Sequence, residues 1–148
     1  MSHRTIEFSN EVTVRRTPAE VFSFLSDFTQ LPRWNYAITS TRQVTPGPVG
    51  LGSSFRQLRS VPTTSEESFE VTVWEPDRRL AITGDFGPFS GTLTYELEAV
   101  GSATVVVNRA QLSPRGLVGV VAGLAGSRVR AAVAENLEVL RRGLEEGF

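Results

Sequence analysis

The 148-residue sequence has no cysteine and a single histidine, His3, and each of its fifteen cationic residues is arginine because lysine is also missing. A chain without cysteine has no thiol nucleophile, disulfide, iron–sulfur cluster or thiolate zinc site. Without lysine it cannot form a Schiff base with a carbonyl substrate or with pyridoxal phosphate. A serine–histidine–acid triad would depend on His3 alone. We therefore expect no metal site and no organic cofactor.

The sequence also lacks a large net charge of either sign and any long apolar run. Fifteen arginines against sixteen acidic residues give a formal net charge of -1, so no basic field is available to hold nucleic acid or anionic lipid. The first residues lack the apolar run of a signal peptide, and the most apolar window, residues 117–125, is too short to span a membrane. We expect a cytoplasmic protein with no nucleic-acid partner and no membrane span, and the sequence leaves a homodimer open.

Residue patterns predict one α+β domain covering residues 1–148. Apolar and polar residues alternate from residue 5 to residue 14, which is typical of a strand with one buried face. Thr17, Pro18 and Glu20 then supply the N-cap, the first-turn proline and the N3 carboxylate of a short helix. A second short helix should end before Pro32, because a proline ring disfavours helical backbone at the preceding residue.

Six more strands and a long helix are predicted to follow. The strand patterns cover residues 38–44, 53–60, 65–75, 79–83, 89–99 and 103–112, and short turns between several of them favour antiparallel pairing. From Leu117 onward the apolar period changes to about 3.6 residues, which predicts an amphipathic helix. One helix, about 10 Å wide, is too narrow to fill the concave side of a seven-stranded sheet. A ligand cavity between sheet and helix is therefore the geometric expectation.

Several short motifs carry a resemblance to a known family. In chain order they are Thr17-Pro18-Ala19-Glu20-Val21-Phe22, Leu25, Asp27 and Phe28, Pro32 and Trp34, Gly50, Gly52 and Phe55, and Trp74-Glu75-Pro76 with Arg79-Leu80. This order resembles the polyketide cyclase/dehydrase and lipid-transport family of the START-like (Bet v 1-like, SRPBCC) helix-grip superfamily. The resemblance implies a curved seven-stranded antiparallel sheet around a long C-terminal helix, two short helices between strands 1 and 2, and a hydrophobic cavity. It implies no particular reaction, since the family includes both aromatase/cyclases and carriers.

Strand pairing predicts which side chains line the cavity. A turn centred on Thr63 would place Phe55 opposite Val71, Gln57 opposite Phe69, and Arg59 opposite Glu67, all on the apolar face. On a later strand, Leu93 and Tyr95 share the inward parity. The last hairpin leaves two registers open: a two-residue turn brings Asn108 inside, and a three-residue turn brings Arg109 inside.

These positions give a ligand-binding hypothesis: a small hydrophobic or aromatic molecule, lipid-like or polyketide-like, occupies the cavity. The candidate ligand-binding residues are Trp34, Phe55, Gln57, Arg59, Phe69, Val71, Leu93, Tyr95, Val121 and Leu124. One alternative is a cofactor-independent cyclase or dehydratase in which Tyr95, Arg59 and Glu67 are catalytic. Another is a protein-binding regulator, which would carry contiguous apolar residues on the convex face of the sheet.

Structural roles compete with these functional ones. Arg59 and Glu67 would also suit a solvated ion pair at a hairpin end, and Tyr95 and Trp34 would suit packing in the core. Trp74 has the opposite parity to Val71 and Val73, which predicts a position on the convex face or at a strand end. The glycine-rich segment 116–126 suits either close backbone packing on the sheet or a mobile gate over the cavity.

Overall fold

The computed structural model describes residues 5–115 and 122–148, with side chains described outside residues 116–125. The elements are β1 (Ile6–Val14), α1 (Pro18–Leu25), the 3-10 helix η1 (Phe28–Gln30), α2 (Leu31–Trp34), β2 (Ile38–Gln43), β3 (Ser54–Arg59), β4 (Ser65–Glu75), β5 (Arg79–Phe86), β6 (Phe89–Val100), β7 (Ala103–Pro114) and α3 (Ala122–Glu146). The first residues of the predicted last helix, 117–121, lie outside the described residues.

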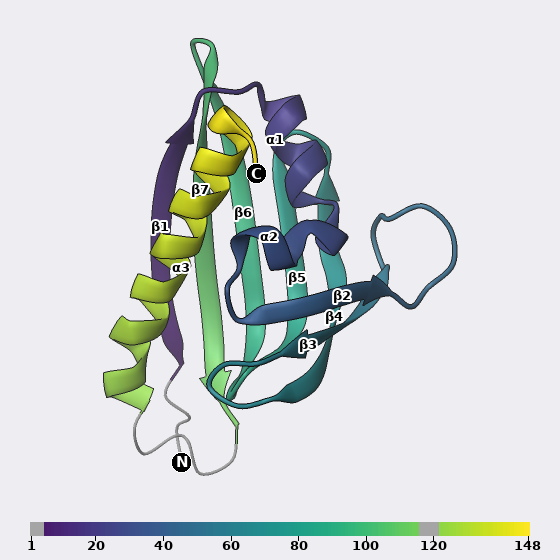
Figure 1. The fold of residues 1–148 in the computed structure, drawn as a ribbon, viewed down its shortest axis with the longest axis vertical. Helices are drawn as coiled ribbons and strands as arrows, with labels where there is room; N and C mark the ends of the chain where they lie inside the picture. The colour runs from purple at the N-terminus through teal and green to yellow at the C-terminus, as the bar shows by residue number, and fades with distance from the viewer. Residues whose placement is uncertain (1–4, 116–121) are drawn as a thin grey trace.

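The seven strands form one antiparallel sheet in the order β1-β7-β6-β5-β4-β3-β2. Each strand pairs with its neighbour in sequence except that β1 closes against β7. α1, α2 and α3 all lie on the same face of the sheet, and α3 runs across β1 and β7 (Figure 1). This arrangement confirms the predicted α+β helix-grip fold.

The start of α1 is fixed locally by its capping residues. The Thr17 side chain accepts a hydrogen bond from the Glu20 backbone N–H at 3.2 Å, and the Glu20 carboxylate accepts one from the Thr17 N–H. These bonds with Thr17 hold the pKa of the Glu20 carboxyl below its ordinary value. The capping box predicted from the sequence is therefore confirmed, and Val21, Phe22 and Leu25 of the helix are buried against the sheet.

The β3–β4 hairpin has a register two residues away from the predicted one. Phe55 pairs with Phe69 rather than Val71, Gln57 pairs with Glu67, and Arg59 pairs with Ser65. The turn is centred on Pro62 instead of Thr63, so each β3 residue pairs with a β4 residue two positions earlier than predicted. Because a two-residue shift preserves the alternation of faces, the side chains still point to the predicted side of the sheet.

The β6–β7 hairpin adopts the shorter of the two predicted turns. Val100 pairs with Ala103 around Gly101, which has a φ of 62°, and Tyr95 consequently pairs with Asn108. A positive φ of this kind is readily adopted by glycine and is required in tight hairpin turns. Asn108 is therefore buried on the concave face, whereas Arg109 lies on the outer face and forms an ion pair with Glu96.

A β-bulge in β4 rules out the convex-face alternative for Trp74, which lies near the end of the strand. The pairing to β5 shifts between Val71 and Val73, so that Thr72 is an extra residue in the strand. An extra residue reverses the face of every side chain that follows it. Trp74 is thereby turned inward, where its ring meets Phe22 of α1 edge-on at a centroid distance of 5.1 Å.

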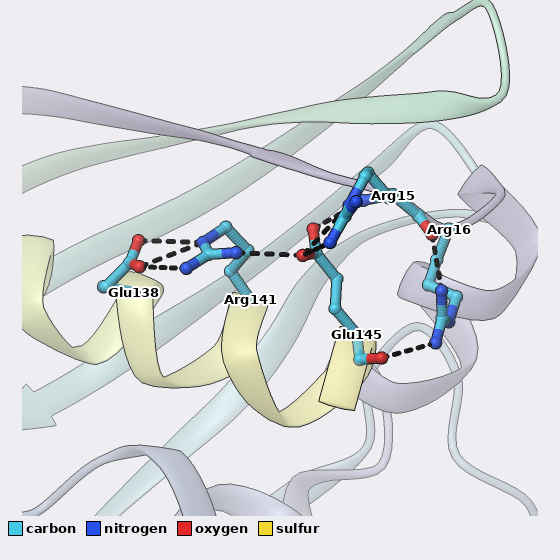
Figure 2. A network of polar contacts seen from close by, with 5 residues as sticks. All are labelled: Arg15, Arg16, Glu138, Arg141 and Glu145. Atoms are coloured by element: carbon cyan, nitrogen blue, oxygen red, sulfur yellow. Dashed lines mark hydrogen bonds and ion pairs between the residues drawn. The ribbon is translucent and has the colours of Figure 1, made fainter. Parts of the chain in front are cut away.

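The C-terminal end of α3 is fastened to the segment between β1 and α1 (Figure 2). The Glu145 carboxylate accepts from the Arg15 backbone N–H at 2.8 Å and from the Arg15 and Arg141 guanidinium groups at 3.2 and 2.9 Å. Arg16 donates to the Glu145 carbonyl oxygen at 2.8 Å. Arg141 also forms an ion pair with Glu138 one turn earlier.

No helix in the described residues is long and apolar enough to cross a membrane.

Candidate functional site

A cavity of about 730 Å³ lies between the concave face of the sheet and α3. Its walls come from the α2–β2 connection, the inner faces of β3, β5, β6 and β7, the β3–β4 and β5–β6 loops, and α3. The lining residues are Leu31, Asn35, Tyr36, Ala37, Gln57, Arg59, Val61, Pro62, Ile82, Phe86, Pro88, Phe89, Leu93, Tyr95, Leu112, Arg128, Val129, Ala132, Val133 and Asn136. Most of these side chains are apolar, and a cavity of this size accommodates a small organic molecule.

Four of the predicted ligand-binding residues line this cavity: Gln57, Arg59, Leu93 and Tyr95. Trp34, Phe55, Phe69 and Val71 do not, because they are buried in the closed core beside it. Val121 and the side chain of Leu124 lie outside the described residues, as does most of the glycine-rich segment for which a gate was considered.

An aromatic cluster explains why the predicted cavity wall is displaced. Phe55 and Phe69 stack on each other with centroids 5.2 Å apart, and Phe28 of η1 meets both edge-on at 4.9 and 5.3 Å. These rings fill the space over β3 and β4 that the sequence-based pairing assigned to the ligand. Phe28 of η1 covers this part of β3 and β4, and the open volume begins beyond the rings, where Gln57 and Arg59 of β3 and Leu31 of α2 are lining residues.

The structure adds lining residues outside the predicted ligand-binding set. On α3 these are Val129, Ala132, Val133 and Asn136, which recur at steps of three and four residues. That spacing is the signature of one helical face and was the available signal. Asn35 and Tyr36 lie on an irregular connection, where no periodic pattern exists to reveal which side chains point inward.

Glu67 joins three segments at one end of the cavity. Its side chain is only 2% exposed and accepts hydrogen bonds from Gln57 Nε2 at 2.7 Å, Arg59 Nε at 2.9 Å and the Gly87 backbone N–H at 2.9 Å. The Arg59 Nη2 atom lies 2.8 Å from the same carboxylate. The Arg59 side chain is 13% exposed, so this is a largely buried pair and not a solvated salt bridge at a hairpin end.

Tyr95 lies far along the sheet from that cluster. Phe89, also a lining residue, is the first residue of β6, and the interval from Phe89 to Tyr95 in the middle of the strand is about 20 Å of extended backbone. Burial raises the pKa of the Tyr95 phenol, so the hydroxyl stays protonated at ordinary pH and can donate a hydrogen bond. The Trp34 ring meets the Tyr95 ring edge-on, with ring centroids 6.3 Å apart. Trp34 therefore packs behind Tyr95 and does not line the cavity itself.

These features correspond to a sequence family. The profile of the family described as polyketide cyclase / dehydrase and lipid transport matches residues 5–145. The chain belongs to this family. Comparison with curated proteins gives no match.

Solved structures show the same fold. A START superfamily protein from Mycobacterium smegmatis superposes with a TM-score of 0.75 at 19% identity, covering 93% of this chain and 98% of that one. The protein TTHA0849 from Thermus thermophilus gives 0.70 at 22% identity, covering 95% of both chains. The di-domain ARO/CYC StfQ from the steffimycin biosynthetic pathway gives 0.71 at 12% identity, covering 93% of this chain and 50% of that one. At these identities the likenesses show the fold alone.

Proposed function

We propose that this member of the family binds one small, mainly apolar molecule in the cavity under α3. The observation that carries the proposal is the cavity itself, about 730 Å³ of space lined mostly by aliphatic and aromatic side chains. Protein interiors are otherwise close-packed, so a fold that leaves such a volume loses the dispersion contacts of its lining. A ligand that fills the space restores those contacts and removes its own apolar surface from water.

The cyclase or dehydratase alternative has weaker geometric support. It requires Tyr95, Arg59 and Glu67 to surround one reacting molecule, but Glu67 does not line the cavity and both its oxygens accept hydrogen bonds from protein donors. Tyr95 and the Glu67 cluster stand at different ends of the space. A group that transfers protons must reach the atom it protonates or deprotonates, so this arrangement suits a binding role better than a shared catalytic one.

The regulator alternative also has little support, because it needs apolar residues together on the convex face. There, hydroxyl groups of Thr72, Thr83 and Thr92 are hydrogen-bonded in a row. Glu96 forms ion pairs with Arg79 and Arg109 nearby. A polar surface of this kind is typical of contact with water.

A matched pair of substitutions on α3 tests the binding proposal. Ala132 lines the cavity, whereas Ala134 on the same helix is exposed to solvent. We expect Ala132→Trp to fill part of the cavity and to weaken binding of the neutral fluorescent probe N-phenyl-1-naphthylamine by tenfold or more. Ala134→Trp introduces the same indole on the outside and should leave the affinity unchanged. Fluorescence titration at one protein concentration measures both.

Equal affinity of both variants and the unmodified protein would contradict the proposal, since the probe would then bind elsewhere. Circular dichroism and thermal unfolding establish that each variant is folded before titration. Native mass spectrometry of freshly purified protein complements the titration. It should show a bound small molecule in the unmodified protein and in Ala134→Trp but less of it in Ala132→Trp.

A further inference from the structure

The polar end of the cavity contains a neutral, self-paired cluster. Arg59 contributes one positive charge and Glu67 one negative charge, and the two groups are in direct contact. Arg128, the other charged residue among those described as lining the cavity, is exposed to solvent. Among the described lining residues there is thus no buried cation that lacks an acidic partner. An anionic ligand group placed beside the Arg59–Glu67 pair would lose its hydration without gaining a free counter-charge.

Gln57 provides a buried acceptor that this cluster leaves without a partner among the described residues. Its side chain lines the cavity, and the residue is 4% exposed. The amide Nε2 donates to Glu67 Oε1 at 2.7 Å, whereas Gln57 Oε1 is buried without a hydrogen-bond partner among the described residues. The orientation of the amide follows from chemistry, because the reverse orientation would place its oxygen against a carboxylate oxygen that accepts from Arg59.

A buried acceptor without a donor is costly, and a ligand that supplies the donor removes that cost. Gln57 Oε1 can only accept a hydrogen bond, so the ligand group that suits it is a hydroxyl or an N–H. A carboxylate offers only acceptors and would meet the amide oxygen with like partial charge. An ether or ketone has an oxygen but no proton to donate.

We propose that the cavity selects neutral ligands that carry a hydroxyl or N–H donor next to an apolar body, and that Gln57 Oε1 accepts the hydrogen bond from that donor. The proposal rests on the proposed function, since it specifies which molecules the cavity binds. It distinguishes alcohols and phenols from fatty acids and other organic acids of the same size.

Three naphthalene derivatives test the selection. At pH 7, 2-naphthol is neutral with a donor, 2-methoxynaphthalene is neutral without one, and 2-naphthoate is anionic. Isothermal titration calorimetry on the unmodified protein should give 2-naphthol an affinity about tenfold above that of 2-methoxynaphthalene, which is the scale of one buried hydrogen bond. 2-Naphthoate should bind weaker than both.

The variant Gln57→Met keeps the length of the side chain and removes the acceptor. We expect it to bind 2-naphthol and 2-methoxynaphthalene with equal affinity, through loss of the naphthol preference. Gln111→Met, on the exposed face of β7, serves as the matched control and should keep the preference. Retained binding of 2-methoxynaphthalene by Gln57→Met establishes that the cavity of that variant is intact. If Gln57→Met does not fold, the ranking of the three probes on the unmodified protein still decides the question.

The outcomes separate this inference from the proposed function. If 2-methoxynaphthalene or 2-naphthoate binds the unmodified protein as well as 2-naphthol does, the donor selection is wrong while ligand binding stands. The same conclusion follows if Gln57→Met keeps the naphthol preference. If none of the three probes binds, the proposed function fails and the inference fails with it.

Discussion

Asn108 has a polar side chain in a buried position that offers it no hydrogen-bond partner among the described residues. It is fully buried on the concave face of β7, and neither its Oδ1 nor its Nδ2 has a hydrogen-bond partner among the described residues. Asn10, which pairs with Asn108 from the adjacent strand β1, donates instead to the Arg130 carbonyl oxygen of α3 at 3.1 Å. A buried amide without partners lowers the stability of the fold by the desolvation of both groups.

We predict that Asn108→Val raises the free energy of unfolding by about 1–3 kcal/mol, the usual cost of leaving a buried polar group unpaired. Valine is close to asparagine in size and suits a strand. Urea unfolding followed by circular dichroism measures the difference. Asn10→Val is the control, and because it removes the bond to Arg130 it should not stabilise the protein. A destabilised Asn108→Val variant would mean that the Asn108 amide does have partners in solution.

At the scale of single elements, α3 is held at its C-terminal end by charge. Glu145 links Arg15, which follows β1, to Arg141 one turn back on the helix (Figure 2). The hydrogen bond from the Arg15 backbone N–H is the main cause that holds the pKa of the Glu145 carboxyl below its ordinary value of 4.5. A lowered pKa means that the folded state stabilises the charged form.

The predicted consequence is a pH-dependent effect of Glu145→Gln. The stability from this carboxylate is fully present above the unfolded-state pKa and is lost as the pH falls through the lower folded-state pKa. Glu145→Gln should therefore destabilise the protein most near neutral pH, and the difference should shrink below about pH 4.5. Thermal unfolding from pH 3 to pH 7 measures it, with exposed Glu146→Gln as the control. A difference that does not change with pH would contradict this role.

The β-bulge at Thr72 is a second element-scale feature with a consequence for the site. By reversing the faces of β4, it brings Trp74 against Phe22 and thereby anchors α1 over one end of the sheet. η1 then follows α1 over β3 and β4, where Phe28 completes the aromatic cluster with Phe55 and Phe69. The cluster fills the part of the concave face over Phe55 and Phe69 and leaves the neighbouring part, from Gln57 to α3, to the cavity.

At the scale of the whole molecule, the cavity separates two walls that a ligand would connect. One wall is α3, which is attached to β1 and to the β1–α1 segment, and the other is the inner face of β5 and β6. A ligand that binds only the folded state stabilises it by mass action, by about 2.7 kcal/mol at a hundredfold excess over its dissociation constant.

We predict that binding slows amide hydrogen exchange on both walls together. Mass-spectrometric exchange with and without 2-naphthol should show added protection in peptides covering residues 128–136 of α3 and residues 82–95 of β5 and β6. Exposed loops outside the cavity, such as residues 45–52, should be unaffected. Protection on one wall alone, or protection that persists in Ala132→Trp, would be inconsistent with a ligand held between sheet and helix.

Local sequence chemistry determined the order and type of most elements. The expected end of the second short helix before Pro32 was wrong, because Pro32 lies in the first turn of α2, where a proline is tolerated. The Thr17–Glu20 capping box and the alternating strands follow from neighbouring residues, so they were predictable without tertiary contacts. The same holds for the inward parity of Gln57, Arg59, Leu93 and Tyr95, because parity along a strand is unaffected by a two-residue shift in pairing.

Only the tertiary structure decided which inward-facing side chains meet a ligand and which form core. Phe55 and Phe69 have the same parity as Gln57, yet they are covered because η1 delivers Phe28 onto them. The β4 bulge and the β3–β4 register depend on pairing between strands and on packing against the helices, which a single segment does not encode. The cavity is the space that the packed side chains of several elements leave unfilled. Its position therefore follows from the assembled fold and not from any one stretch of sequence.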